Sequence, residues 1–406
     1  MNKQENKKQD KIKKASTFVF RLLRVLVFIL WEKYRFRFEY NTSKGIKRPC
    51  LILSNHSTAF DQFAVGVGFY FGINFIASDS LFRHGFKSWL MKVLVRPIPF
   101  SKGSADASAI IKMFSVIRQG GSIGMFPSGN ASIFGEECTI KPGIGKLAKK
   151  LGVPVVLVQI RGGYNTKPRW KNKPNKGKIR ASVTRYISTD ELKTMKYDQL
   201  EEIIRSEIYF NEFEWNAAQK IEFKGKYKAE FLERVLFYCP ECRSLDKLSS
   251  KGNEFFCSCG MRLLINGIGF FEKINNSDNC PDSILEWSKK QLEYIKSINY
   301  ADYLDKPLFS DHNVSLFNVI RSKKDELIGK GIMEMFGNKI RICGRDFDVL
   351  NIRDISVQSR NRLIIYTEEG EFTVDMSSRG NAVKYMICCY HLKNIALNIT
   401  DGHYGY

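Results

Sequence analysis

The 406-residue sequence lacks an apolar run long enough to cross a bilayer. Its most hydrophobic stretch, Phe18 to Trp31, is about fourteen residues long and is interrupted by Arg21 and Arg24, whereas a spanning helix needs about twenty apolar residues. A small-residue cleavage site after this stretch is also missing, which argues against a signal peptide. Because ten cysteines occur without a cleavable signal, we expect a reducing cytoplasm.

Acidic residues are scarce in two regions that are dense in basic ones. Residues 1–48 hold fourteen Lys or Arg against four acids, a net of +10, and thirteen Lys or Arg but no acid lie between Glu137 and Asp190. The whole chain has a formal charge of +22, which favours an anionic partner: a membrane, nucleic acid or an acidic acyl carrier protein.

The first basic region is interpreted as a tail and a helix that lies in the membrane interface, with Trp31 at the boundary. An ordinary core helix behind a disordered tail is the alternative. The second region includes Lys167 to Lys176, which is rich in Pro and Lys. We expect a surface loop there that rests on the membrane or receives an acidic acyl carrier protein, unless it is simply solvated.

The most informative motif is His56 and Asp61 with four residues between them, directly after the apolar run Leu51 to Leu53. Acyl transfer to a hydroxyl needs a base that removes its proton, an effect worth roughly 10²- to 10⁴-fold in rate. Imidazole suits this task, and a carboxylate behind it fixes the tautomer. We expect Asp61 to turn back on His56 from an early helix that Ser57 or Thr58 caps. A surface loop with a capping network would show the same residues.

A second loop, Phe126 to Ser132, follows another short apolar run about seventy residues later. A helix and the β-branched strand Val153 to Val158 come after it. This order predicts an α/β fold with substantial parallel pairing. Sites in such sheets form beyond the carboxyl ends of the strands, where both His56 and this loop are expected.

Four blocks in order resemble the glycerolipid acyltransferase family, whose members move fatty acyl groups to glycerol-phosphate or lysophospholipid acceptors. The blocks are Asn55 to Asp61, Arg96 to Lys102, Phe126 to Gly129 and Val153 to Val156. The resemblance covers about residues 45 to 215. It implies a glycerolipid acyltransferase-like α/β domain with His56 and Asp61 as the catalytic pair.

The implied activity is that of an O-acyltransferase similar to 1-acylglycerol-3-phosphate acyltransferases of phospholipid biosynthesis, on the cytoplasmic face of a membrane as a peripheral or monotopic protein. His56 would deprotonate the acceptor hydroxyl, which attacks the thioester of acyl-CoA or acyl carrier protein without a covalent enzyme intermediate. Loop N–H groups or Lys102 would stabilise the oxyanion. The substrate-binding residues expected from the resemblance are Asn55, Lys102, Phe126, Pro127, Ser128, Gly129, Asn130 and Lys141.

Three positions depart from the family pattern. Ser128 and Ala131 stand where the third block usually has Glu and Arg, and Lys102 stands where the second usually ends in Arg. A lysine makes a point contact where an arginine binds bidentately. A phosphate held by Lys102, Lys141 and the N–H groups around Gly129 and a different head group are therefore both consistent with the sequence.

Two cysteine pairs predict a zinc ribbon in the second half of the chain. Cys239 and Cys242 are followed by Cys257 and Cys259, with a polar turn between the pairs. Four thiolates supply a closed tetrahedral site for a structural Zn²⁺. A redox dithiol is the rival interpretation, but one residue between Cys257 and Cys259 does not suit it. The other six cysteines are interpreted as buried apolar residues.

The last hundred residues predict seven short strands and a terminal helix from Ala382 to Leu397. This pattern suggests a pleckstrin-homology-like barrel. The expected domain organisation is a basic tail and interfacial membrane helix (1–44), the acyltransferase domain (45–215), a helix and zinc ribbon (216–275), a helical linker (276–304) and the β-rich domain (305–406).

A non-catalytic binding protein is the alternative from another class. Zinc ribbons and basic loops also suit nucleic acid, and the first domain would then be a degenerate scaffold. Arg243, Lys247 and Lys251 of the ribbon are, however, interspersed with Glu241, Asp246 and Glu254. The ribbon is therefore not a concentrated basic patch, which argues against nucleic acid as a partner. The expected partners remain a membrane lipid surface and an acyl donor.

Overall fold

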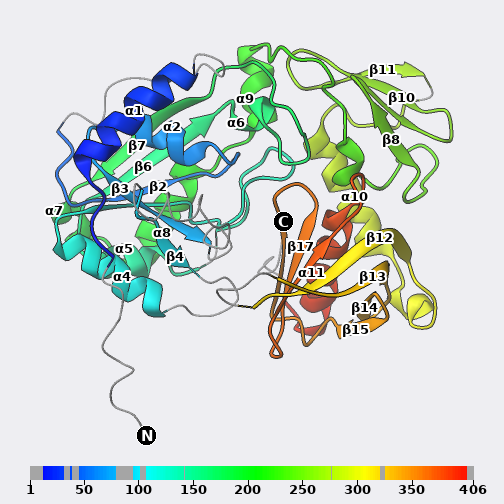
Figure 1. Ribbon diagram of the computed structural model, residues 1–406. Coiled ribbons are helices and arrows are strands. Elements are labelled where there is room, and N and C mark those ends of the chain that lie inside the picture. The colour runs from blue at the N-terminus through cyan, green and yellow to red at the C-terminus, as the bar shows by residue number, and fades with distance from the viewer. Residues whose placement is uncertain are drawn as a thin grey trace, which may run out of the picture. The chain divides into compact units, whose positions relative to one another are not determined.

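The computed structural model describes residues 12–31, 37–38, 45–78, 95–100, 107–140, 142–275, 277–320 and 325–399. The chain forms two compact units (Figure 1). Unit 1 comprises Met1–Asn130, Ile140–Gly163 and Lys178–Phe210, and unit 2 comprises Ala131–Thr139, Tyr164–Gly177 and Asn211–Tyr406. The five domain boundaries expected from the sequence remain predictions.

Unit 1 is an α/β structure. Its helices are α1 (Thr17–Trp31), α2 (Asp61–Val67), α4 (Ala107–Arg118), α5 (Ile144–Leu151), α7 (Thr189–Thr194) and α8 (Tyr197–Ile208). Its strands are β1 (Arg37–Phe38), β2 (Leu51–Ser54), β3 (Ile73–Ser78), β4 (Ile98–Phe100), β5 (Ser122–Met125), β6 (Val155–Arg161) and β7 (Arg180–Ile187). The short helix α6 (Gly163–Thr166) begins at Gly163, where the segment Ile140–Gly163 of unit 1 ends.

The strands form one mixed sheet in the order β1-β7-β6-β2-β5-β3-β4. Only β6 and β7 pair antiparallel, and every other neighbouring pair is parallel. The predicted parallel pairing is therefore confirmed. Strands β2 and β5 lie side by side, with Leu51 opposite Ile123, so the segments that follow them leave the same edge of the sheet.

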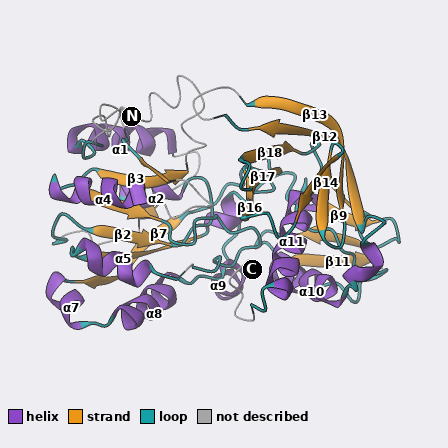
Figure 2. Ribbon diagram, turned by 90° about the horizontal axis from the view of Figure 1, so that it is seen from below, coloured by secondary structure: helices purple, strands orange, loops and turns teal. Residues whose placement is uncertain are grey.

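Both faces of the sheet are covered, which explains why its central strands are apolar throughout. Leu51 and Leu53 of β2 pack with α4, α5 and α8, whereas Ile52 packs with α2 on the opposite face. Figure 2 shows α1 on one side of this sheet and α5 and α8 on the other. The resulting rigid centre holds the turn after β2 in place.

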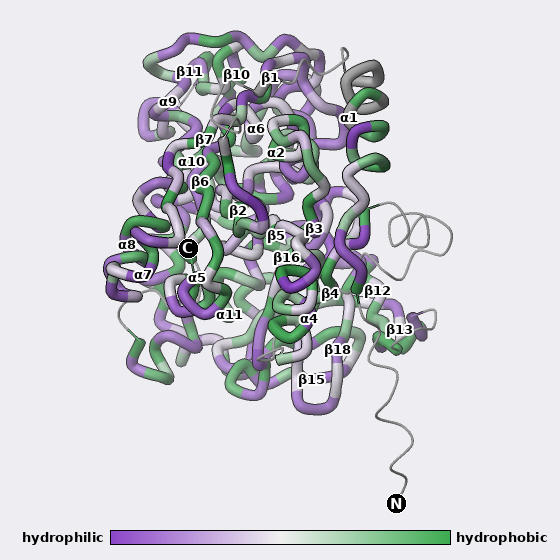
Figure 3. Tube along the Cα trace, turned by 90° about the vertical axis from the view of Figure 1, so that its left-hand side faces the viewer, coloured by the Kyte–Doolittle hydropathy of each residue, from purple (hydrophilic) through white to green (hydrophobic). Residues whose placement is uncertain are grey.

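Helix α1 confirms the helix predicted after the basic tail, whereas its position in a membrane interface stays a prediction. It packs on α2, where a Cβ built on Gly66 would lie 3.1 Å from Phe20 Cζ. Phe18, Leu22 and Val25 are exposed by 78%, 62% and 57%, and Figure 3 shows hydrophobic and hydrophilic residues alternating along the helix. Among the helices that the structure describes, none combines the length and apolarity that a bilayer crossing requires.

Unit 2 contains two antiparallel sheets. Its helices are α9 (Glu212–Gln219), η3 (Leu232–Arg234), α10 (Ile284–Ser297), η4 (Tyr300–Tyr303) and α11 (Ala382–Ala396). The small sheet consists of β8 (Leu248–Lys251), β9 (Glu254–Cys257), β10 (Arg262–Ile265) and β11 (Phe271–Asn275). The large sheet consists of β12 (Phe309–Asn318), β13 (Glu326–Met335), β14 (Lys339–Ile342), β15 (Arg345–Asp348), β16 (Asp354–Gln358), β17 (Arg362–Tyr366) and β18 (Glu371–Asp375).

The seven predicted strands and the terminal helix of the last hundred residues are confirmed. The large sheet has the order β15-β14-β13-β12-β18-β17-β16. One buried cluster of apolar side chains includes residues of both sheets and of α10 and α11. Unit 2 therefore has a continuous core, in which Trp287 of α10 is fully buried.

The expectation of a surface loop at residues 167–176 was wrong for its centre. Trp170 and Lys171 are each only 2% exposed within unit 2. The Lys171 ammonium donates to Asn175 Oδ1, and burial, together with the nearby Lys167 and Lys228, lowers the pKa of Lys171 to about 7. A high content of Pro and Lys did not reveal that the aromatic ring and the lysine stem pack inward.

Five of the six remaining cysteines are buried as expected: Cys50, Cys138, Cys280, Cys388 and Cys389. The sixth, Cys343, is half-buried in the turn between β14 and β15. Burial raises the pKa of Cys388 and Cys389 to about 12. These thiols therefore stay protonated at neutral pH, in keeping with a packing role.

Candidate active site and metal centre

His56 and Asp61 are in direct contact. The turn after β2 carries His56, and Asp61 is the first residue of α2. His56 Nδ1 lies 2.7 Å from Asp61 Oδ2. The imidazole is 20% exposed and the carboxylate is fully buried, so Asp61 meets the ring from inside the protein and leaves part of the ring open to a reactant.

The turn itself holds the Asp61 carboxylate. Oδ2 accepts hydrogen bonds from the Ser57 N–H at 2.6 Å and the Thr58 N–H at 2.9 Å, and Oδ1 accepts one from Ser57 Oγ at 3.2 Å. A buried carboxylate needs such donors because its oxygens have lost their hydrogen bonds to water. The prediction that Ser57 or Thr58 caps α2 was therefore wrong. Phe60 is the N-cap residue, and its side chain makes no capping hydrogen bond. Asp61 instead accepts hydrogen bonds from the turn that precedes the helix.

Two backbone contacts position this turn against β6. Asn55 is buried, and its side chain donates to Ile160 O at 2.8 Å and accepts from Ile160 N at 2.6 Å. Gly163 lies so close to Ser57 that a Cβ built on it would collide with Ser57 Oγ. These contacts fix the end of β2 relative to the end of β6.

The loop after β5 lies against the histidine. The Phe126 ring is stacked on the His56 ring with centroids 4.5 Å apart and planes inclined by 19°. Pro127 and Ser128 are buried, and Ser128 Oγ donates to Asn130 O at 3.2 Å. Gly129 is exposed, has a φ of 68° and donates its N–H to Phe126 O at 3.0 Å. The structure thus brings His56, Asp61 and residues 126–130 to one edge of the sheet.

Lys102 and Lys141, which were predicted to contact substrate, lie outside the described residues. Helix α5, which follows Lys141, has a carboxylate of the protein itself at its N-terminus. Glu201 Oε2 accepts hydrogen bonds from Gly143 N at 2.9 Å and Gly145 N at 3.3 Å. A carboxylate of α8 therefore already occupies the N-terminus of α5, where a phosphate would otherwise be favoured.

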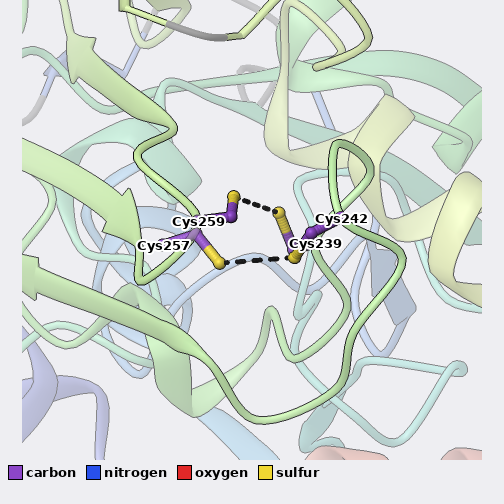
Figure 4. Close-up of side chains that lie close together, drawn as sticks. All are labelled: Cys239, Cys242, Cys257 and Cys259. Atoms are coloured by element: carbon purple, nitrogen blue, oxygen red, sulfur yellow. Dashed lines mark hydrogen bonds between the residues drawn. The ribbon is translucent and has the colours of Figure 1, made fainter.

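Unit 2 brings the four predicted metal ligands together, as Figure 4 shows. The Sγ atoms of Cys239, Cys242, Cys257 and Cys259 all lie within 4.8 Å of one another. Cys239 and Cys259 are 3.9 Å apart, and Cys242 and Cys257 are 3.7 Å apart. A regular tetrahedron with metal–sulfur bonds of about 2.3 Å has sulfur–sulfur edges of about 3.8 Å. The four thiols therefore fit a zinc ion.

Two backbone turns carry the four sulfur atoms. Cys239 N donates to Ser244 O, and Cys257 N donates to Met261 O, each at 3.0 Å. Burial raises the pKa of Cys239 and Cys257. For Cys242, hydrogen bonds involving Ser244 outweigh burial and lower the pKa to about 7. One cysteine is thus readily deprotonated, which is the first requirement for binding a cation.

The contact of a histidine and an aspartate at the carboxyl ends of the parallel strands of this mixed α/β sheet is accompanied by similarity to a known family. Residues 33–161 match the Acyltransferase family. This part of the chain, about a third of its length, is therefore similar to acyltransferases.

Its curated homologues include two 1-acyl-sn-glycerol-3-phosphate acyltransferases. The enzyme of Borreliella burgdorferi is 29% identical over 167 residues, which are 40% of this chain and 65% of that protein. The chloroplastic enzyme of Brassica napus is 26% identical over 115 residues, 28% of this chain and 33% of that protein. The chain thus spans less than two thirds of either relative.

A solved structure is also similar, that of the 1-acyl-sn-glycerophosphate acyltransferase PlsC of Thermotoga maritima. It shares 19% sequence identity with this chain at a TM-score of 0.38, covering 47% of this chain and 73% of that one.

Three residues that shape the site were missed in the sequence. Phe75 of β3 stacks on Phe126, Ile160 pairs with Asn55, and Gly163 makes room for Ser57. The signal available was the Gly162-Gly163 pair at the end of β6, because consecutive glycines at the carboxyl end of a strand indicate a close backbone approach. The other two contacts join segments far apart in the sequence, and no local pattern indicates them.

Proposed function

We propose that this protein transfers a fatty acyl group from a thioester donor to the hydroxyl of a lysophospholipid such as 1-acylglycerol 3-phosphate. The observation that carries the proposal is the 2.7 Å contact between His56 Nδ1 and the buried Asp61 carboxylate. Because Nδ1 faces Asp61, we assign Nε2 as the ring atom that accepts the proton of an acceptor hydroxyl. The names of the two curated relatives support this class of acceptor.

His56 acts as general base in this proposal, and Asp61 holds the ring and stabilises the imidazolium that forms. The hydroxyl oxygen attacks the thioester carbonyl of acyl-CoA or acyl carrier protein, and the thiol leaves. The loop 126–130 lies beside His56, and its residues Pro127 to Asn130 are the proposed substrate contacts, together with Lys102 and Lys141. For Asn55 we propose a positioning role, since its amide is engaged by Ile160.

We further propose that the protein acts as a peripheral protein at the cytoplasmic surface of an anionic membrane. Phe18, Leu22 and Val25 form an exposed apolar stripe on α1, and the chain has a formal charge of +22. Such a helix lies in the interface with its apolar face among the acyl chains. Each Lys or Arg near an anionic surface contributes about 1 kcal/mol.

For unit 2 we propose a structural zinc ribbon and a pleckstrin-homology-like module. Four cysteines leave no open coordination position, so the ion would hold the two turns of the small sheet together. The strand order of the large sheet, with a helix following its last strand, supports the second assignment. Residues 216–275 and 305–406 remain the proposed bounds.

The test is acyl transfer by the purified protein. Labelled acyl-CoA and acyl carrier protein are supplied with 1-acylglycerol 3-phosphate, glycerol 3-phosphate and other lysolipids, and products are identified by mass. His56→Gln should reduce kcat by about 10²- to 10⁴-fold, and Asp61→Asn by a similar factor. His312→Gln, the same change at an exposed histidine of β12, is the control. A wild-type protein that binds lysolipid without product would favour the non-catalytic alternative.

A further inference from the structure

Three aromatic rings form a continuous stack that begins at the proposed base. The ring of Phe126 covers the His56 imidazole at 4.5 Å with nearly parallel planes. The Phe75 ring is stacked with that of Phe126 at 6.0 Å and 11°. The stack therefore runs from His56 through Phe126 to Phe75.

The sheet dictates this order of rings. Phe75 lies in β3, Phe126 follows β5, and His56 lies in the turn after β2. These three strands are consecutive neighbours, β2-β5-β3, and all pair parallel. Successive rings are thus delivered by successive strands, so their spacing is set by the hydrogen bonds of the sheet.

A glycine in the middle strand makes room for the third ring. A Cβ built on Gly124 of β5 would lie 2.6 Å from Phe75 Cδ1 and 2.8 Å from Ile73 Cγ2, closer than packed atoms approach. Phe75 is only 7% exposed. The outer ring is therefore fixed by the core of unit 1, and it supports Phe126 from behind.

A hydrogen bond at one atom does not fix the plane of an imidazole. The bond between His56 Nδ1 and Asp61 Oδ2 permits the ring to tilt, whereas proton transfer requires the Nε2 lone pair, which lies in the ring plane, to point at the acceptor hydroxyl. A flat ring stacked on one face removes this freedom. An aromatic face also attracts the imidazolium that forms during the reaction.

We infer that Phe126, supported by Phe75, is a positioning residue that fixes the plane of the His56 ring, and not a residue that binds substrate. This inference rests on the proposed function for its catalytic consequence, but ring orientation is measurable without turnover. It revises the sequence-based expectation that Phe126 contacts the substrate.

The test compares Phe126→Leu, Phe126→Tyr and Phe75→Leu with wild type. Leucine fills space without a flat face, whereas tyrosine keeps the ring. We expect Phe126→Leu to lower kcat by about 10- to 100-fold with KM within about twofold, Phe75→Leu to lower kcat less, and Phe126→Tyr to retain at least half of the rate. Phe69→Leu is the matched control, since Phe69 is a fully buried ring of the same unit outside the stack.

A second measurement, ¹⁵N NMR of the imidazole, reports the ring directly. The signals of His56 are assigned with His56→Gln. We expect wild type to show one tautomer, protonated at Nδ1, and ring-current shifts from Phe126. In Phe126→Leu the ring-current shifts should be lost and the imidazole signals should broaden as the ring plane becomes mobile, while the tautomer set by Asp61 is kept and circular dichroism confirms that the variant is folded.

Each adverse outcome has a separate meaning. A higher KM with unchanged kcat in Phe126→Leu would return Phe126 to substrate binding and overturn the inference. Imidazole signals in that variant that stay as narrow as in wild type would also overturn it, because the ring would then keep its plane without Phe126. If wild type transfers no acyl group to any acceptor, the proposed function fails, and the NMR spectra still decide whether the stack orients His56.

Discussion

At the scale of single residues, the site depends on how tightly the turn after β2 is packed. Ser57 donates to Asp61 from both its backbone N–H and its hydroxyl, so any movement of Ser57 moves the carboxylate that contacts His56. Gly163 stands directly behind Ser57. A residue without a side chain is therefore required there because of space, since Cβ and Oγ would occupy the same volume.

Gly163→Ala should displace Ser57 and with it the Asp61 carboxylate. We expect kcat to fall by about 10- to 100-fold, because a shift of about 1 Å in a catalytic group has effects of this size. Overpacking should also reduce the free energy of unfolding by about 1–3 kcal/mol. Urea denaturation and initial rates of acyl transfer measure the two effects.

A double-mutant cycle supplies the control for this change. Ser57→Ala alone removes one hydroxyl donor to Asp61 and should cost less than Gly163→Ala. Combined with Gly163→Ala it also removes the colliding Oγ, so the double variant should be more stable than Gly163→Ala. Equal and additive losses in both backgrounds would show that Gly163 and Ser57 are not in contact.

Residues of the site differed in how far the sequence revealed them. His56 and Asp61 were predictable because their spacing places one residue in the turn after a strand and the other at the start of the next helix, where the two side chains can meet. The stack of Phe126 and Phe75 was not, because it depends on which strands are neighbours in the sheet. The strand order β2-β5-β3 places these rings together, and sequence distance does not show it.

At the scale of elements, α5 begins in an unusual way. Its N-cap is Gly143, which has no side chain to accept the free N–H groups of the first turn. Glu201 of α8 supplies that acceptor from elsewhere in the chain. Burial by itself would raise the pKa of Glu201, but its bonds with Arg205, Gly143 and Gly145 lower it. The Glu201 carboxylate of α8 thus caps the N-terminus of α5 and links the two helices.

Glu201→Gln should weaken this junction in a pH-dependent way. An uncharged amide attracts the helix terminus less, so we expect a loss of about 1–2 kcal/mol at pH 7. Because the folded-state pKa lies below the unfolded value of about 4.3, the carboxylate stabilises above that value and loses its effect as pH falls through the folded pKa. The difference from wild type should therefore shrink between pH 5 and pH 3.

Glu202→Gln is the matched control, since the adjacent residue of α8 is exposed and undergoes the same change of charge. It should alter the free energy of unfolding by less than about 0.5 kcal/mol. Thermal unfolding at several pH values gives the comparison. A loss for Glu201→Gln that stays constant down to pH 3 would mean that packing of the side chain, and not its charge, holds α5.

The positions of the strands were easier to predict from the sequence than which residues are buried. Alternation of apolar residues located every strand of the large sheet, because one face of each strand packs on the core. The segment around Trp170 failed, since its Pro and Lys content is typical of a solvated loop. Its Trp170 ring belongs to the apolar core of unit 2, and Arg234 donates to Trp170 O at 2.8 Å and to Asn172 Oδ1 at 2.9 Å. Contacts between segments so far apart in the sequence leave no local pattern.

At the scale of the molecule, the four-cysteine cluster is part of the core of unit 2. Cys239 and Cys257 belong to the same buried cluster as the apolar residues of the large sheet. Asp246, which lies between the two cysteine pairs, is 2.8 Å from the buried ammonium of Lys384 in α11, and that ammonium is 2.8 Å from Asp311 of β12. Losing the geometry of the cysteine turns would therefore leave Lys384 with one carboxylate fewer.

Removal of the metal should destabilise both sheets of unit 2 together. Zinc binding contributes on the order of 10 kcal/mol in small zinc modules, and a buried lysine without its carboxylate partner is costly. We expect about one zinc per chain in wild type and none in Cys239→Ser. Hydrogen exchange in residues 309–375 should accelerate at least tenfold in Cys239→Ser or after treatment with a chelator.

Two comparisons make this result specific to the metal. Cys343→Ser changes a cysteine outside the cluster and should retain both the zinc and the slow exchange. Strands β2 and β6 belong to unit 1, whose cores contain none of the four cysteines, so their exchange should stay slow. If residues 309–375 keep wild-type exchange while the zinc is lost, the ribbon is a separate module, and the shared core does not transmit the loss of the metal to the large sheet.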